Sequence, residues 1–212
     1  MSKETRDLDI EYGQRLQRMA DIATDVRSHT APHLRNLIVF SDENKWTAAG
    51  LAAVYSTDFV DGRWARKGAH LQGLEEPKGD GHERDPKADK DLLNNVLAGL
   101  ALRYLRENDL HSAAIVGVNY LVTQWRDRKM EKYRVNAKEG GLDKKDIKAI
   151  NTNRAKTLAQ GIAVTALTGL SSDNRRARRV ALATLSVGTG TGIVGMYQYG
   201  RRVRRKLANA TL

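Results

Sequence analysis

The stretch that decides the fold runs from Asp58 to Asp89 and reads DFVDGRWARKGAHLQGLEEPKGDGHERDPKAD. It carries two pairs of aspartates, Asp58 with Asp61 and Asp85 with Asp89, at spacings of i,i+3 and i,i+4. Residues at these spacings lie on one face of a helix, so each pair would present two carboxylates in the same direction. Such oxygen donors suit hard cations such as Mg²⁺ or Mn²⁺. The competing interpretation is that these aspartates are solvated surface residues or helix caps.

The segment before the first pair is uncharged and rich in good helix formers. It reads WTAAGLAAVYST at residues 46–57, and it predicts a helix whose last turns carry Asp58 and Asp61. After this helix, glycines, a proline and alternating charges predict a mobile loop from Lys67 to Arg84.

Further helices are expected after this loop. The first should begin near Asp85, where Pro86 suits a first turn, and end near Leu105. Three more uncharged segments predict helices, at residues 110–125, 157–172 and 180–200. Only the last reaches the length of about 20 residues that crosses a bilayer. The shorter ones suit either buried helices of a soluble bundle or short spans extended by snorkelling Lys and Arg side chains.

Glycines mark two more features of the C-terminal half. Gly140-Gly141 predicts a turn within the basic segment 126–156. The sequence GTGTG at 188–192 lies in an apolar segment, and its small residues predict close helix packing rather than a phosphate loop.

The N-terminal residues 3–28 predict an amphipathic helix. Their apolar residues recur at helical spacing: Leu8, Ile10, Leu16, Met19, Ile22 and Val26. Such a helix would pack on a core or lie on an anionic membrane. After Pro32 there is a short apolar run, LIVF at 37–40, which the following charges stop.

Composition narrows the classes of function. A chain of 212 residues without cysteine predicts one globular unit, without disulfides, thiolate metal sites or cysteine nucleophiles. Its net charge of +11 attracts nucleic acid, anionic lipid or phosphorylated small molecules without choosing among them. No zinc-finger spacing, aromatic strand platform or helix-turn-helix pattern is found, so nucleic acid is not an expected partner. The alternative to an enzyme is a basic soluble helical protein that binds nucleic acid or anionic membranes.

The opening stretch resembles the signature of the CDP-alcohol phosphatidyltransferase family, D-x-x-D-G-x-x-A-R, a spacer, then G-x-x-x-D-x-x-x-D. All eight fixed positions are present: Asp58, Asp61, Gly62, Ala65, Arg66, Gly81, Asp85 and Asp89. The wording TDFVDGRWAR and DPKADK also looks like the bacterial phosphatidylglycerophosphate synthase branch. Downstream, the R-D and K-T-x-x-Q positions of that branch are matched more weakly, by Arg126-Asp127, Arg134, Lys156-Thr157 and Gln160.

The resemblance implies an all-α membrane bundle, here of five to six helices. We expect an N-terminal amphipathic segment over residues 1–33, the helical domain over 34–206 and a tail over 207–212. The implied reaction transfers a phosphatidyl group from CDP-diacylglycerol to an acceptor alcohol, with glycerol 3-phosphate expected, and releases CMP in phospholipid biosynthesis. The implied location is the cell membrane, multi-pass and surrounded by membrane lipid, with the active site facing the cytoplasm. A homodimer is left open.

The resemblance also assigns roles to residues. The four aspartates of the signature would hold Mg²⁺ or Mn²⁺, and Asp89 would also be the general base. The nucleotide site would be shaped by Gly62, Ala65, Arg66 and Gly81. Candidates for binding an acceptor phosphate are Arg126, Arg134 and Lys156, with a solvated or membrane-surface role as the alternative for each.

Some features depart from the family pattern. The spacer between Arg66 and Gly81 is longer than usual, and Arg84 stands where a leucine is common. Only the LIVF run stands where a first spanning helix is expected, so five apolar helices are counted. A cytoplasmic active site turns the arginine-rich loop 171–179 outward, against the positive-inside tendency. An inactive, divergent family member is therefore a further alternative.

Overall fold

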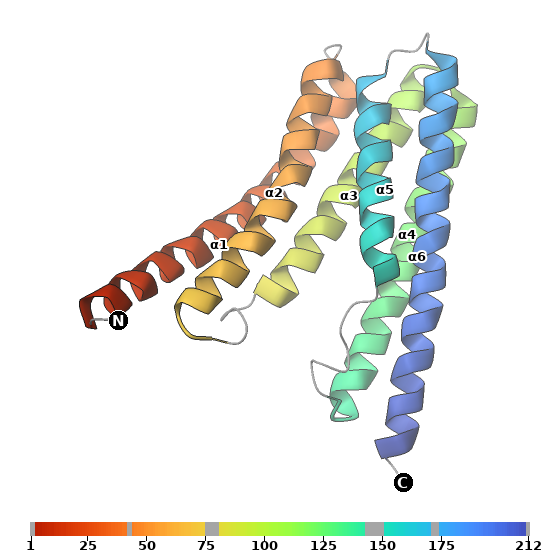
Figure 1. Cartoon of the computed structure of the whole chain (residues 1–212). Coiled ribbons are helices and arrows are strands. Elements are labelled where there is room, and N and C mark those ends of the chain that lie inside the picture. Colours follow the sequence, from red (N-terminus) through yellow and green to blue (C-terminus); the bar gives the residue numbers. More distant parts are fainter. Residues whose placement is uncertain (1–2, 42–43, 75–80, 143–150, 171–173, 211–212) are drawn as a thin grey trace. The chain divides into compact units, whose positions relative to one another are not determined.

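The computed structural model describes residues 3–41, 44–74, 81–142, 151–170 and 174–210. These described residues form six α-helices and no strand, which confirms the predicted all-α fold (Figure 1). In chain order the helices are α1 (Lys3–Phe40), α2 (Asn44–Leu71), α3 (Gly81–Arg106), α4 (Leu110–Glu139), α5 (Asn151–Gly169) and α6 (Arg175–Ala210). They divide into two compact units, residues 1–99 and 100–212.

The first unit begins with α1, which passes through Pro32 without ending. A proline inside a helix costs about 3 kcal/mol, because it removes one hydrogen bond and crowds the preceding turn. Burial around the proline offsets this cost, since Ala31, Leu34 and Ile38 all lie in the core. The helix therefore extends well beyond the predicted residues 3–28, and the LIVF run forms its last turn.

Helix α2 is longer than predicted. It continues to Leu71, so the first aspartate pair lies in its middle rather than in its last turns. The final turns are held by contacts with α1. Gly68 is buried there, and the ammonium of Lys67 lies 5.5 Å from the centroid of the Tyr12 ring, a cation–π contact. Tertiary packing thus keeps helical a segment whose glycine and charges predict a loop.

Helix α3 begins earlier than predicted, at Gly81 rather than near Asp85, and its end at Arg106 agrees with the sequence. The loop predicted over 67–84 is therefore helical at both of its ends. Residues 75–80, in the middle of that prediction, lie outside the described part of the chain.

Glycines bring α1 close to both of its neighbours. At the crossing with α2, a Cβ on Gly13 would lie 2.7 Å from the carbonyl oxygen of Gly68, and a Cβ on Gly68 would lie 2.6 Å from that of Gly13. On α3, a Cβ at Gly99 would lie 3.1 Å from the carbonyl oxygen of Arg35. Glycine is required at the first crossing because the obstructing atoms are backbone. The two contacts hold α1 against α2 and α3.

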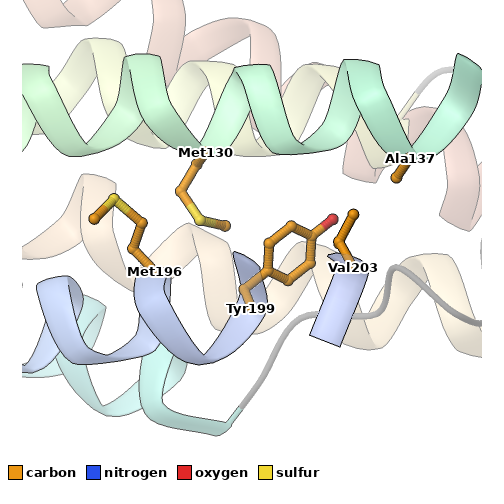
Figure 2. Close-up of a cluster of buried hydrophobic side chains, with 5 residues drawn as sticks. All are labelled: Met130, Ala137, Met196, Tyr199 and Val203. Atoms are coloured by element: carbon orange, nitrogen blue, oxygen red, sulfur yellow. The ribbon is translucent and has the colours of Figure 1, made fainter. Parts of the chain in front are cut away.

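In the second unit a hydrophobic cluster joins α4 to α6 (Figure 2). Its buried members are Met130, Ala137, Met196, Tyr199 and Val203. Gly200 makes room for it, since a Cβ there would lie 2.6 Å from Cζ of Tyr133. Helix α4 ends beside this cluster, with Gly140 as its cap and Gly141 at φ +71°. The predicted turn at these two glycines is confirmed.

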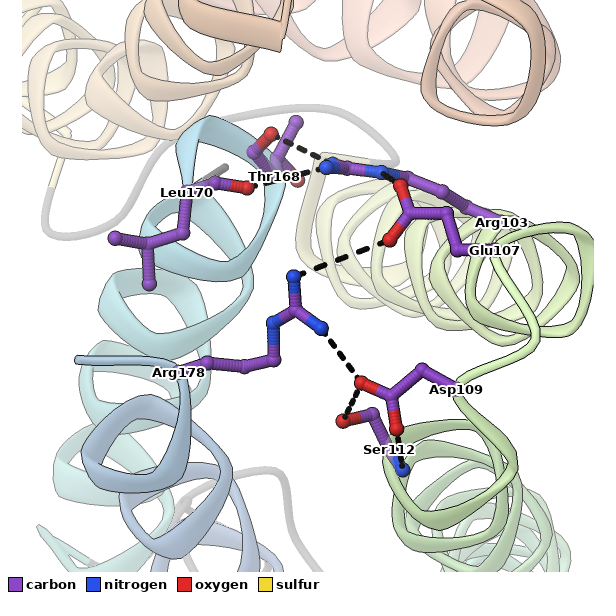
Figure 3. A network of polar contacts seen from close by, with 7 residues as sticks. All are labelled: Arg103, Glu107, Asp109, Ser112, Thr168, Leu170 and Arg178. Atoms are coloured by element: carbon purple, nitrogen blue, oxygen red, sulfur yellow. Dashed lines mark hydrogen bonds and ion pairs between the residues drawn. The ribbon is translucent and has the colours of Figure 1, made fainter. Parts of the chain in front are cut away.

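Arg103, in the last turn of α3, binds the C-terminal end of α5 (Figure 3). Its guanidinium is buried and donates hydrogen bonds to the carbonyl oxygens of Thr168 at 2.9 Å and Leu170 at 3.1 Å. Its Nε donates to Glu107 at 2.7 Å. These carbonyls belong to the C-terminal end of α5, whose last carbonyls have no partner within the helix. Arg103 therefore supplies both a cap and a favourable charge.

Arg178, in the first turns of α6, is the second buried arginine of this network (Figure 3). It donates to Asp109 at 2.6 Å, and another of its nitrogens lies 3.9 Å from Glu107. Asp109 also caps α4 by accepting hydrogen bonds from the backbone and hydroxyl of Ser112. Burial raises the pKa of Asp109, but the hydrogen bonds from Ser112 and Arg178 outweigh burial and hold that pKa below its ordinary value. One arginine of the 171–179 loop is thus neutralised within the protein.

One segment of the described chain, Arg175–Asn209, is long and apolar enough to cross a membrane. It contains the 180–200 segment, the only one to which the sequence gives a spanning length. Of the predicted domain boundaries, the one after residue 33 falls inside α1, and the one after residue 206 falls inside α6.

Candidate active site

In the first unit, a buried arginine of α1 joins two aspartates of the signature. Nη1 of Arg27 donates to Oδ1 of Asp89 on α3 at 2.8 Å, and Nη2 donates to Oδ2 of Asp61 on α2. The same Nη2 also donates to the hydroxyl of Thr24 at 3.2 Å. The guanidinium is fully buried. One carboxylate from each predicted pair therefore converges on a single positive charge.

The two carboxylates differ in exposure. The side chain of Asp61 is 2% exposed and that of Asp89 is 31% exposed. A ligand can therefore reach Asp89 from solvent, whereas Asp61 lies beneath the surface of the unit. This difference separates two residues that the sequence spacing treats alike.

Sequence reasoning missed Arg27. The signal was present, because Arg27 occupies the buried face of α1, in register with Ala20, Thr24, Ala31 and Leu34. An arginine on the apolar stripe of an amphipathic helix stays charged when buried, and so it requires an anionic partner. Asp61 and Asp89 lie 34 and 62 positions away along the chain, and no local pattern indicates which carboxylates those partners are.

The other signature residues are only partly described. Asp58 and Asp85 lie in α2 and α3, and their side chains are outside the described part of the structure, as is the side-chain environment of Gly81. On α2, the guanidinium of Arg66 lies over Gly62, where a Cβ would be 3.4 Å from Nη1. Ala65 is half-buried and Arg66 is exposed. Arg66 is thus placed to meet a ligand from solvent.

The donor chemistry of the Arg27 site fits a divalent cation. Within the described residues no three His, Asp or Glu side chains gather as a metal site, a set that leaves out Asp58 and Asp85. The position of the Arg27 guanidinium supports this fit, because it shows that carboxylate oxygens from α2 and α3 already surround one positive charge. Hard carboxylate oxygens so arranged suit Mg²⁺ or Mn²⁺.

A second polar group lies in the interior of the second unit. Arg126 and Lys156 are buried on α4 and α5, and both lie against Gly192 of α6. A Cβ at Gly192 would be 2.8 Å from Nη1 of Arg126 and 3.1 Å from Cδ of Lys156. Arg126 is also paired with Asp127, to which its Nε donates at 3.0 Å. The structure therefore brings together two of the three predicted phosphate-binding residues.

The third of them, Arg134, lies apart from this pair. It is half-exposed, and its only ion pair in the described chain is with Glu131 on the same helix at 3.9 Å. Such a partly exposed pair contributes little to stability, in the range of about 0 to 1 kcal/mol.

The GTGTG segment of α6 explains how these polar side chains are accommodated. Gln160 of α5 donates to the hydroxyl of Thr189 at 2.9 Å, and its Cγ would lie 3.0 Å from a Cβ on Gly188. One turn later, Arg126 and Lys156 lie against Gly192. Close packing at this segment, as the sequence predicts, is confirmed. Its glycines here make space for polar side chains of a neighbouring helix.

The family model for CDP-alcohol phosphatidyltransferases matches residues 18–192 of the chain. The chain belongs to the CDP-alcohol phosphatidyltransferase family. The matched region includes Arg27, the eight signature positions and Gly192. No curated protein and no solved structure matches significantly. Membership makes the chain an enzyme that transfers substituted phosphate groups, in phosphatidyl transfer from a CDP-alcohol during phospholipid synthesis. This favours the enzyme over the basic binding protein.

Proposed function

We propose that this CDP-alcohol phosphatidyltransferase uses CDP-diacylglycerol as donor and a phosphorylated alcohol, glycerol 3-phosphate, as acceptor. The observation that carries the choice of acceptor is the buried pair of cations at Gly192, Arg126 with Lys156. A phosphate group bound between them would accept charge-assisted hydrogen bonds from both side chains. An acceptor without phosphate would make no such bonds there.

Asp89 is proposed as the general base that takes the proton of the acceptor hydroxyl. It is the more exposed of the two aspartates that Arg27 joins, so the acceptor hydroxyl can approach it. In the reaction the hydroxyl oxygen bonds to the phosphatidyl phosphorus, its proton passes to Asp89, and the bond to CMP breaks. Asp61 is proposed as a ligand rather than a base, because its carboxylate is buried.

The proposed cofactor is Mg²⁺ or Mn²⁺, held by Asp61 and Asp89 together with Asp58 and Asp85. When bound, it would neutralise the diphosphate and stabilise the leaving CMP. The nucleotide is proposed to bind along α2, over Gly62 and Ala65, with Arg66 pairing with phosphate and Gly81 allowing close approach. The enzyme is proposed to span the cell membrane several times, with this site on the cytoplasmic side.

The test is CMP release by the detergent-purified chain from CDP-diacylglycerol with Mg²⁺ and a panel of acceptors. We expect release with glycerol 3-phosphate and none with glycerol or serine. Asp89→Asn should abolish release. Lys156→Ala should raise KM for glycerol 3-phosphate by roughly tenfold or more, and Lys156→Arg should restore part of it.

Arg134→Ala is the matched control, a cation removed from a partly exposed position on α4 away from Gly192, and it should leave KM unchanged. Equal release with neutral acceptors would remove the phosphate argument. Release that is unchanged in Asp89→Asn would remove the assigned base.

A further inference from the structure

The feature that no signature position accounts for is the arginine between the two aspartates. Arg27 comes from α1, outside the stretch Asp58 to Asp89, and its guanidinium is fully buried. It lies between Oδ1 of Asp89 and Oδ2 of Asp61, which are oxygens that a divalent cation would use. We propose that Arg27 is the internal cation of this site, and that it competes with the divalent metal for Asp61 and Asp89. This inference rests on the proposed metal site.

The physical reason for such a residue is the cost of the site without metal. Asp61 is buried, and a buried carboxylate without a positive partner is expensive. Its neighbour Asp89 adds like-charge repulsion. The guanidinium of Arg27 removes both costs, because its planar fork donates to the two carboxylates at once. The protein can then fold before metal arrives.

The backbone keeps Arg27 in place. α1 meets α2 at Gly13 and Gly68, and it meets α3 where Arg35 lies against Gly99. These contacts lie on either side of Arg27 along α1, so the helix cannot easily withdraw. Exchange of guanidinium for metal therefore falls to the side chain, while the α1 backbone stays against its neighbours.

Competition has a definite sign. A divalent cation and a guanidinium within about 4 Å repel each other, so metal binding must overcome the presence of Arg27. Removing its charge should weaken the metal-free protein and strengthen metal binding. A residue that merely oriented the aspartates would show the opposite effect on metal affinity, because its loss would disorder the ligands.

The experiment measures Mn²⁺ binding by electron paramagnetic resonance and thermal unfolding, on the full chain in detergent without substrate. We expect Arg27→Met to lower the Tm of the metal-free protein, to bind Mn²⁺ about tenfold or more tightly, and to regain Tm when Mn²⁺ is added. Arg27→Lys retains the charge on a flexible stem, and should fall between the two in both measurements.

Arg103→Met is the matched control. It also removes a buried arginine that pairs with a carboxylate, but in the second unit. It should lower Tm while leaving Mn²⁺ affinity unchanged. If Arg27→Met does not fold, the comparison of Arg27→Lys with the wild type decides, because tighter Mn²⁺ binding in the lysine variant is still required.

Mn²⁺ affinity that is unchanged or lower in a folded Arg27 variant would overturn the competition, even if the wild type releases CMP normally. Absence of Mn²⁺ binding in every variant would overturn it as well. Failure of the proposed function would give a different result, namely no CMP release by a wild-type chain that binds Mn²⁺. The two failures are therefore distinguishable.

Discussion

Gly192 shows how a residue without a side chain can define a polar site. Its missing Cβ is what lets Arg126 and Lys156 reach the same point on α6, since an added methyl would lie 2.8 Å from Nη1 of the arginine. The obstructing atoms belong to flexible side chains, so they can move aside without unfolding the protein. The predicted consequence lies in binding geometry rather than in stability.

Gly192→Ala should therefore displace the cations and lower kcat/KM for glycerol 3-phosphate by about ten- to hundredfold, since catalysis is sensitive to shifts of about 1 Å. Tm should change little. Gly190→Ala is the matched control in the same segment, because a Cβ there meets nothing within 4 Å. Steady-state kinetics with CDP-diacylglycerol held constant measures the effect. Similar kinetics for the two variants would show that the contact at Gly192 is irrelevant to the acceptor.

At the scale of single residues, the sequence alone identifies all eight signature positions and both residues that lie against Gly192, Arg126 and Lys156. The sequence does not identify which of these residues contact one another. Arg27 is an ordinary charged residue in a helix with many charges, and only the fold shows that its face of α1 is buried. Asp61 and Asp89 appear equivalent in spacing, and only the fold shows that they differ in burial.

At the scale of helices, the α1–α2 crossing is tightly constrained. A Cβ added at either Gly13 or Gly68 would meet the carbonyl oxygen of the other residue, and a backbone atom cannot rotate away as a side chain can. The same α2 carries Gly50, where a Cβ would meet nothing within 4 Å. The two glycines of one helix therefore predict opposite outcomes for the same substitution.

Gly68→Ala should force α1 and α2 apart and destabilise the protein by about 1–3 kcal/mol, the usual cost of overpacking. Gly50→Ala should stabilise it by up to about 1 kcal/mol, because alanine favours a helix more than glycine does. Thermal unfolding in detergent compares them. If both variants shift Tm in the same direction, the close crossing is wrong.

The sequence predicts the helices better than their ends. Its helix-forming segments lie in α1 to α6, except that segment 157–172 runs past the end of α5 at Gly169 into residues outside the described part of the chain. The turn at Gly140-Gly141 is confirmed. The predicted N-terminal helix stops at residue 28 and the predicted loop starts at Lys67, but α1 continues to Phe40 and α2 to Leu71. In α1 the burial of the residues around Pro32 outweighs the local preference against a helix, and in α2 the contacts with α1 do so. Such preferences amount to a few kcal/mol, and the sequence alone does not reveal the contacts that overcome them.

At the scale of the whole molecule, the distribution of charge bears on the proposed orientation in a membrane. A cytoplasmic active site would place the start of α6 outside the cell, although residues 175–179 carry four arginines. The network around Asp109 reduces this conflict. Arg178 is buried and paired with Asp109 and Glu107, so it contributes little free positive charge to the loop. At the other end of α6, Arg201, Arg202, Arg204 and Arg205 are all exposed.

This charge difference predicts the orientation of α6, with residue 176 outside and residue 202 inside. The chain has no cysteine, so a single introduced cysteine reports its own position without background. In intact cells a membrane-impermeant maleimide should label Arg176→Cys, and it should label Arg202→Cys only after permeabilisation. Both residues are exposed, so labelling depends on the side of the membrane rather than on burial. Labelling of Arg202→Cys alone in intact cells would reverse α6, and equal labelling of both would mean that α6 does not span.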